Sequence, residues 1–157
     1  MRRMLLLCAA LLLAVPGAAQ EAPTRATTAT LLQAARSTDD AVVFARSIAG
    51  LIRRAHEVPA ERRSVTEGLT EFVGGGNAVK RAIAVDAVKS LPTDARSSMV
   101  PALSRMAERS PDGPVTRLYV RGLAEAGPPG LEALRQMVGR GRLSGDALAL
   151  ARMYLGA

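Results

Sequence analysis

Glycine and proline interrupt this chain at short intervals, and the apolar segments between them are about ten to fifteen residues long. Within the segments, apolar side chains recur at the spacing of one helix face, and few stretches alternate in the two-residue pattern of a strand. Aromatic residues make up only 3% of the chain, so packing must rely on Ala, Leu, Val, Ile and Met. We therefore predict an all-helical protein built from short antiparallel helix pairs.

Capping residues and turns define the expected helices. Asp39 and Asp40 are suited to cap a long second helix, Gly74 ends the third, and Asn77 caps the fourth. Pro101 is expected near the start of its helix, or else to kink it. The predicted helices cover residues 28–36, 39–56, 60–73, 77–91, a fifth from Asp94 or Ser98 to Arg109, then 115–126, 131–138, and a last one after Gly145 to Leu155.

Two helical segments recur at an interval of about 35 residues, the size of a helix-turn-helix repeat. AVDAVKSLP (84–92) matches YVRGLAEAG (119–127), with valines and small residues at the same positions. The helices that precede the two copies also correspond at an offset of 34: Arg62, Val65, Leu69 and Phe72 match Arg96, Met99, Leu103 and Met106. Because one helix pair cannot bury its apolar face alone, the interval predicts a stack of similar pairs. The alternative is a non-repeating helical bundle.

These segments resemble HEAT-type repeats. VKRAIAVDAVKSLP followed by MVPAL, and VTRLYVRGLAEAGPPGLEAL (115–134), are similar to a first helix rich in small residues, a turn and a second helix. The match covers Ala78–Val138, with a poorer copy starting at Val43, and the aromatic positions of tetratricopeptide repeats are missing. The resemblance implies a small α-solenoid that serves as a binding scaffold, and it implies no catalytic residues.

The first nineteen residues have the three parts of a secretory signal peptide: Arg2 and Arg3, an apolar run from Leu5 to Val15, and a small-residue cleavage site before Gln20. The run of about eleven residues is shorter than the roughly 20 that a membrane-spanning helix needs. A lipoprotein would require Cys8 to end the apolar run, and Cys8 lies inside it. We predict a signal peptide (1–19), a polar, partly disordered lead-in (20–38) and a helical-repeat domain (39–157) in a periplasmic or secreted bacterial protein.

Cleavage would limit the chemistry of the mature chain. Cys8 is the one cysteine, so no disulfide, thiolate nucleophile or cysteine metal ligand would remain. Loss of Arg2 and Arg3 from 21 basic residues against 14 acids would leave a net charge of about +5. Only Lys80 and Lys89 are lysines; the arginine and alanine content is typical of a high-GC bacterial genome, so the charge is a weak indication of phosphate binding.

His56 is the single histidine, so a Ser-His-Asp site must use it and a multi-histidine metal site is excluded. It is predicted near a helix C-terminus, where a cation is favourable for structural reasons. We expect no catalytic residue, cofactor or metal. The alternative to a non-enzymatic protein is an enzyme, an envelope hydrolase or lyase that uses carboxylates near His56. The close carboxylate pairs are Asp39 and Asp40, Glu57 and Glu61, and Glu67 and Glu71.

Two glycine-containing segments have some features of anion sites. GGGNAVK (74–80) places glycines before a helix start, but it lacks the P-loop spacing and no strand precedes it, so a connection between helix pairs is the simpler interpretation. GRGRLSG (139–145) is cationic and has the composition of a solvated turn, with phosphate or anionic lipid as the alternative ligand.

The second helices of HEAT-type pairs line the concave face, and here they carry six arginines. We expect this face to bind an acidic protein partner through charge-assisted hydrogen bonds, with solvated, unrelated charges as the alternative. No nucleic-acid partner and no transmembrane segment after cleavage are expected. A helical bundle that assembles with itself is a further alternative. The candidate partner-binding residues are Arg62, Arg63, Arg96, Arg105, Arg109 and Arg135.

Overall fold

The structure, a computed structural model, describes residues 26–109 and 113–157. The predicted signal peptide and residues 20–25 of the lead-in lie outside these ranges. The described residues are all-helical, as predicted, and contain no strand. The elements are α1 (Thr28–Ser37), α2 (Ala41–Glu57), η1 (Pro59–Glu61), α3 (Arg62–Gly74), α4 (Ala78–Ala87), η2 (Val88–Ser90), α5 (Thr93–Arg109), α6 (Pro114–Glu125), α7 (Pro128–Gly139) and α8 (Gly145–Leu155).

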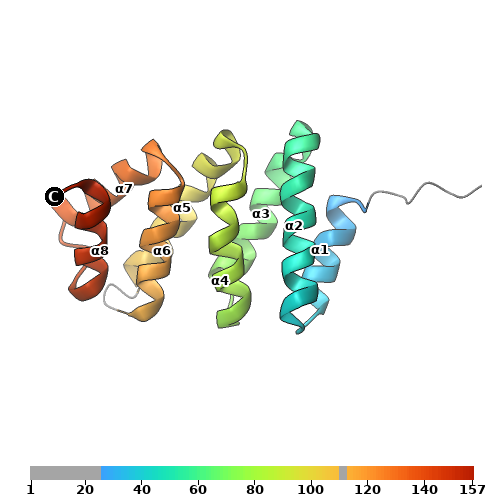
Figure 1. The fold of residues 1–157 in the computed structure, drawn as a ribbon, viewed down its shortest axis with the longest axis horizontal. Helices are drawn as coiled ribbons and strands as arrows, with labels where there is room; N and C mark the ends of the chain where they lie inside the picture. The colour runs from blue at the N-terminus through green and yellow to red at the C-terminus, as the bar shows by residue number, and fades with distance from the viewer. Residues whose placement is uncertain (1–25, 110–112) are drawn as a thin grey trace, which may run out of the picture.

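The helices pack in two rows (Figure 1). The even-numbered helices α2, α4, α6 and α8 lie side by side in one row, and the odd-numbered helices form the other. The principal contacts of each helix are with its neighbours in the same row and with the helices next to it in sequence. The molecule is therefore elongated along the rows, with α1 and α8 near opposite ends.

The core lies between the two rows and uses equivalent positions about 35 residues apart. Val85 and Val120 are both buried, as are Leu69 and Leu103. Small residues bring the backbones together: a Cβ built on Gly122 would lie 2.8 Å from Val85 Cγ1. The burial of these pairs explains why an aromatic-poor sequence packs as stacked helices.

Several predicted helix boundaries are confirmed by their caps. The Asp40 carboxylate accepts hydrogen bonds from the Val42 and Val43 amides, and Asn77 does the same for the first turn of α4. α3 ends at Gly74, with Gly75 as its C-cap. The predicted helix at residues 28–36 is present as α1 and packs on α2. The packed helices thus begin at Thr28, earlier than the expected boundary at Asp39.

Pro101 lies in the interior of α5, because this helix begins at Thr93 and not at Ser98. Of the two expected starts, Asp94 is one residue from the observed one, and the start at Ser98, which would have placed Pro101 in the first turn, is wrong. The Pro101 side chain is exposed, so the ring faces solvent, where the loss of one backbone N–H donor is best tolerated. In the described part of the chain, no helix is both long and apolar enough to cross a bilayer.

Candidate binding groove

The surface between α3 and α5 is hollowed along the length of both helices. Both run in the same direction, since Arg62 contacts Asp94 at their starts and a Cβ on Gly74 would meet Met106 Sδ near their ends. Three open hollows follow one another along this surface and share lining residues, and together they are here named the α3–α5 groove. Small side chains such as Ala95 and Ala102 line it, so the two helices do not fill the space between them.

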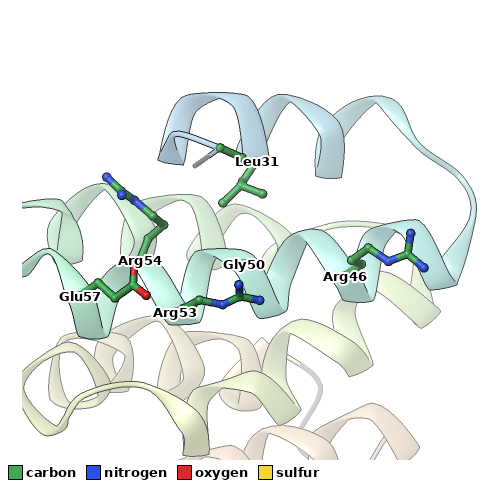
Figure 2. A pocket seen from close by; sticks show the side chains of 7 residues that line it. Leu31, Arg46, Gly50, Arg53, Arg54 and Glu57 are labelled. Carbon is green, nitrogen blue, oxygen red and sulfur yellow. The ribbon is translucent and has the colours of Figure 1, made fainter. Parts of the chain in front are cut away.

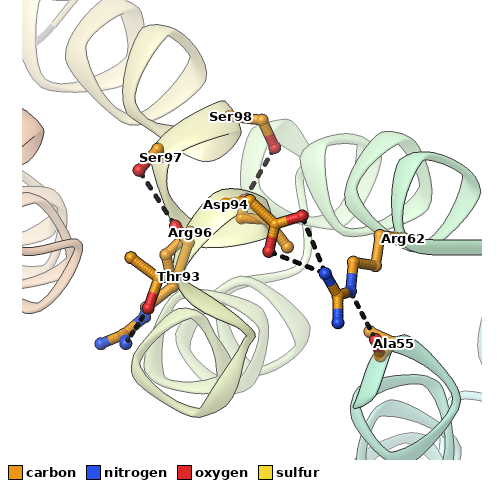
Figure 3. Close-up of polar contacts among 8 residues, drawn as sticks. Ala55, Arg62, Thr93, Asp94, Arg96, Ser97 and Ser98 are labelled. Carbon is orange, nitrogen blue, oxygen red and sulfur yellow. Dashed lines mark hydrogen bonds and ion pairs between the residues drawn. The ribbon is translucent and has the colours of Figure 1, made fainter. Parts of the chain in front are cut away.

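At its start the groove is lined by Arg62, which joins α2, α3 and α5 (Figure 3). Its Nε donates to the Ala55 carbonyl at the end of α2 (2.9 Å), and Nη1 donates to both Asp94 oxygens at 3.1 and 3.2 Å. Desolvation raises the pKa of Asp94, but the hydrogen bond from Arg62, helped by backbone N–H groups, outweighs it and leaves that pKa lowered. Arg62 therefore has a structural role as well as lining the groove.

Arg63 extends from α3 into solvent next to Arg62. Its Nε donates to Glu67 at 2.8 Å, one turn further along the same helix, and this hydrogen bond raises the pKa of Arg63. The Arg63 side chain is 88% exposed, and exposed pairs of this kind contribute little to stability. Its remaining N–H groups are available to a ligand without a large loss of folding free energy.

Three hydroxyl groups lie along the middle of the groove. Thr66 donates to the Arg63 carbonyl, Thr70 to the Thr66 carbonyl and Ser98 to the Ala95 carbonyl. The Thr70 hydroxyl also lies 3.5 Å from Met99 Sδ on α5. Because each hydroxyl donates its proton to a protein acceptor, its oxygen still has acceptor capacity. The middle of the groove therefore offers hydrogen-bond acceptors and the carboxylate of Glu67, and its one arginine, Arg63 at the edge toward the start of the groove, is paired with that carboxylate.

The far end of the groove is lined by Arg105 and Arg109, one turn apart on α5, together with Met106. Both arginines are exposed. Among the described residues, neither forms an ion pair or a side-chain hydrogen bond. Two like charges at this spacing repel one another slightly, while the helix C-terminus favours them. This end is the most cationic part of the groove.

The structure brings together four of the six predicted arginines and separates the other two. Arg96 does not line the groove: Nη1 lies 3.5 Å from the Glu125 carbonyl and Nη2 lies 3.3 Å from Thr93 Oγ1. Arg135 lies on α7 and pairs with Glu132 at 3.0 Å. The predicted row of six is thus a groove with four arginines and two separate side chains.

A second hollow lies between α1 and α2, where Leu31 packs against Gly50. It is lined by Arg46, Arg53 and Arg54, but Figure 2 shows their guanidinium groups spread along α2 instead of converging on one point. Arg54 is also paired with Glu61. This arrangement is less suited to holding one anion than the end of the α3–α5 groove.

His56 is exposed, and its Nε2 lies 2.9 Å from the Ser90 carbonyl, so the ring joins α2 to η2. Among the nearby acids, Glu61 accepts hydrogen bonds from Arg54 and Thr28, which lower its pKa. Within the described ranges no cluster of His, Cys, Asp and Glu is suited to hold a metal ion.

The carboxylate pairs singled out in the sequence have structural partners. Glu67 pairs with Arg63, and Glu71 with Arg36 across α1 and α3. Asp40 caps α2, and the hydrogen bonds from that helix lower the pKa of Asp40.

The segment GGGNAVK ends one helix and caps the next. The Asn77 side chain occupies the first free N–H groups of α4. Lys80 turns back to the preceding helices, with Nζ 3.5 Å from the Ala35 carbonyl, 3.7 Å from Asp39 and 5.6 Å from the Phe44 ring centroid. These contacts fasten α4 to α1 and α2. In the segment GRGRLSG (139–145), Leu143 is buried, while Arg140 and Arg142 are exposed.

Sequence reasoning missed the hydroxyl groups of the groove. Thr66 and Thr70 are four residues apart, and this spacing on one helix face was the available signal. Their alignment with Ser98 depends on the pairing of α3 with α5, which no local pattern specifies.

No protein-family model, curated protein or solved structure matches this chain.

Proposed function

We propose that this chain is an exported, HEAT-like helical-repeat protein that acts as a protein-binding scaffold in the bacterial envelope, with the α3–α5 groove as its partner-binding surface. The two rows of helices and the buried positions about 35 residues apart support the repeat architecture. The leader sequence supports export.

The observation that carries the binding proposal is the pair Arg105 and Arg109 at the end of the groove. The other arginines described on the odd-numbered row have partners, as in Arg36 with Glu71 and Arg62 with Asp94. Arg96 contacts the Glu125 carbonyl and the Thr93 hydroxyl. Cations that lack such partners and line a hollow provide charge complementarity for an acidic partner. The neighbouring groove walls would fix the position of that partner.

Site-specific crosslinking tests the proposal. A photoreactive residue replacing Ser98, exposed in the groove, is expected to capture an envelope protein in living cells. The same residue replacing Ala82, exposed on α4 in the other row, is expected not to capture it. The Arg105→Glu/Arg109→Glu variant should abolish the crosslink.

The control variant is Arg140→Glu/Arg142→Glu, which makes the same change of net charge at exposed positions outside the groove. It should leave the crosslink intact. A crosslink that survives the groove variant, or that is equally strong from position 82, would overturn the proposal. A mass that rises with concentration in light scattering, with no heterologous crosslink, would favour self-assembly.

Export has a separate test. The protein recovered from the envelope fraction should begin at Gln20 when its N-terminus is sequenced. A protein that retains Met1 and remains in the cytoplasm would contradict this part of the proposal.

A further inference from the structure

We infer that the α3–α5 groove binds an extended peptide segment with an acidic pair at one end, an uncharged middle and a further acid about five residues away. The inference rests on the proposed function and specifies the chemistry of its partner. It follows from the order of charges along the groove, the hydroxyl groups between them and the distance between its two ends.

The order of charges places the acids of the ligand at the ends. Arg105 and Arg109 lack partners among the described residues and form the stronger anchor. Arg63, at the other end, is already shared with Glu67 and forms the weaker one. Glu67 also lines the middle of the groove, where it would repel a carboxylate. The middle of the bound segment is therefore uncharged.

The groove favours an extended chain over a docked helix. An amphipathic helix needs a continuous apolar groove, whereas the middle here contains the hydroxyl groups of Thr66, Thr70 and Ser98. Those oxygens retain acceptor capacity because their protons are donated within α3 and α5. The backbone N–H groups of an extended peptide can donate to them, which a helix, with its N–H groups used internally, cannot do.

The length of the groove sets the spacing of the acids. Arg63 and Gly74 lie near the two ends of α3, and at 1.5 Å per residue they are roughly 16 Å apart along the helix axis. An extended peptide covers about 3.3 Å per residue. About five residues therefore separate the two acidic anchors.

Two peptides of identical composition test this spacing. The first has two glutamates, four neutral Ser and Ala residues and one glutamate, and the second has the three glutamates adjacent to one another. Binding to the protein is measured by fluorescence anisotropy at low and at physiological salt. The spaced peptide is expected to bind about tenfold more tightly, and its affinity should fall as salt screens the charges. Equal affinity for both peptides, or no binding of either, would overturn the inference.

Variants separate the two anchors. Arg105→Glu/Arg109→Glu should weaken the spaced peptide by more than tenfold, and Arg63→Glu by a smaller factor. The charge-matched control Arg140→Glu/Arg142→Glu should bind as the parent does. Circular dichroism should show that every variant stays folded, since these arginines are exposed. A loss of binding as large in the control as in the groove variant would show that net charge alone is responsible.

Other polyanions provide the last comparison. A short duplex DNA or an anionic lipid vesicle that binds the groove more tightly than the spaced peptide would overturn the assignment of a peptide. The outcomes also separate the two proposals. A partner crosslinked at position 98 without binding of the spaced peptide would leave the scaffold function standing and reject its ligand chemistry. Binding of the spaced peptide without any crosslinked partner would support the ligand chemistry and reject the scaffold function in the envelope.

Discussion

Two glycines at opposite ends of α7 differ in the space around them. A Cβ on Gly130 would lie 1.9 Å from the Leu123 carbonyl oxygen, which belongs to the backbone and has little freedom to move. A Cβ on Gly139 would meet nothing within 4 Å. Gly130 therefore allows α6 and α7 to approach closely.

We expect Gly130→Ala to lower the free energy of unfolding by about 2–3 kcal/mol, because the added methyl group forces the two helices apart. Gly139→Ala should be neutral or slightly stabilising, since alanine is the better helix former. Urea unfolding of both variants measures the difference. Equal stability of the two would show that the α6–α7 contact relaxes at no cost.

Tyr119 is a buried aromatic side chain whose hydroxyl forms a long-range hydrogen bond. It is 4% exposed, and its hydroxyl donates to the Val73 carbonyl at 3.0 Å, where the end of α3 has no helical donor left. Tyr119→Phe should cost about 1–2 kcal/mol, since the buried carbonyl loses its partner. Tyr154→Phe, at an exposed position, should change stability by less than about 0.5 kcal/mol. Unfolding midpoints in urea test the comparison.

At the scale of helices, consecutive odd-numbered helices are joined at their starts by side chains about 33 residues apart. Thr28 donates to Glu61, the N-cap of α3, and so links α1 to the start of α3. Arg62 donates to Asp94 and links α3 to α5. The corresponding position at the start of α7 is Pro128, whose side chain has no carboxylate to accept a hydrogen bond. The polar links thus hold the first three odd-numbered helices, and α5 meets α7 without one of this kind.

These links predict a dependence of stability on pH. The hydrogen bonds from Arg54 and Thr28 lower the pKa of Glu61 in the folded state. Because this pKa is lowered in the folded state, ionised Glu61 stabilises the fold at pH values above the ordinary carboxyl pKa, near 4. The stabilisation is lost as the pH falls through the lowered folded-state pKa. Glu61→Gln should therefore be less stable than the parent at pH 7, and the gap should narrow at about pH 3.

Urea midpoints at the two pH values test this, with Glu108→Gln at an exposed position as the control. A gap that is unchanged in acid would mean that Glu61 contributes through packing and not through its charge.

The sequence was sufficient to predict the helices, and four of the six arginines that it indicated line the groove. Asp40 and Asn77 act as caps through residues two and three positions away, so a local pattern contains the whole interaction. The link from Arg62 to Asp94 spans 32 residues and depends on how two helices pair. Burial of Leu69 and Leu103 followed from their periodicity, whereas the role of Pro101 depended on where α5 begins.

At the scale of the whole molecule, each helix depends mainly on its nearest neighbours. Leu32→Ala should lower the free energy of unfolding by about 2–5 kcal/mol, because α1 loses packing against the rest of the core. Hydrogen exchange should then increase in α1, α2 and α3, while α6, α7 and α8 keep their protection. Uniform loss of protection along the chain would indicate one cooperative unit.

The arrangement in rows also determines the order in which the chain can fold. α1, α2 and α3 have all their mutual contacts available once Gly74 has been synthesised, and each later helix docks on surfaces that already exist. Contacts between helices that are close in sequence favour fast folding. Because the helices lie in rows, duplication of one helix pair at the end of the chain would lengthen the molecule and leave the existing helix–helix contacts unchanged. This is a simple route by which a chain of this kind can grow.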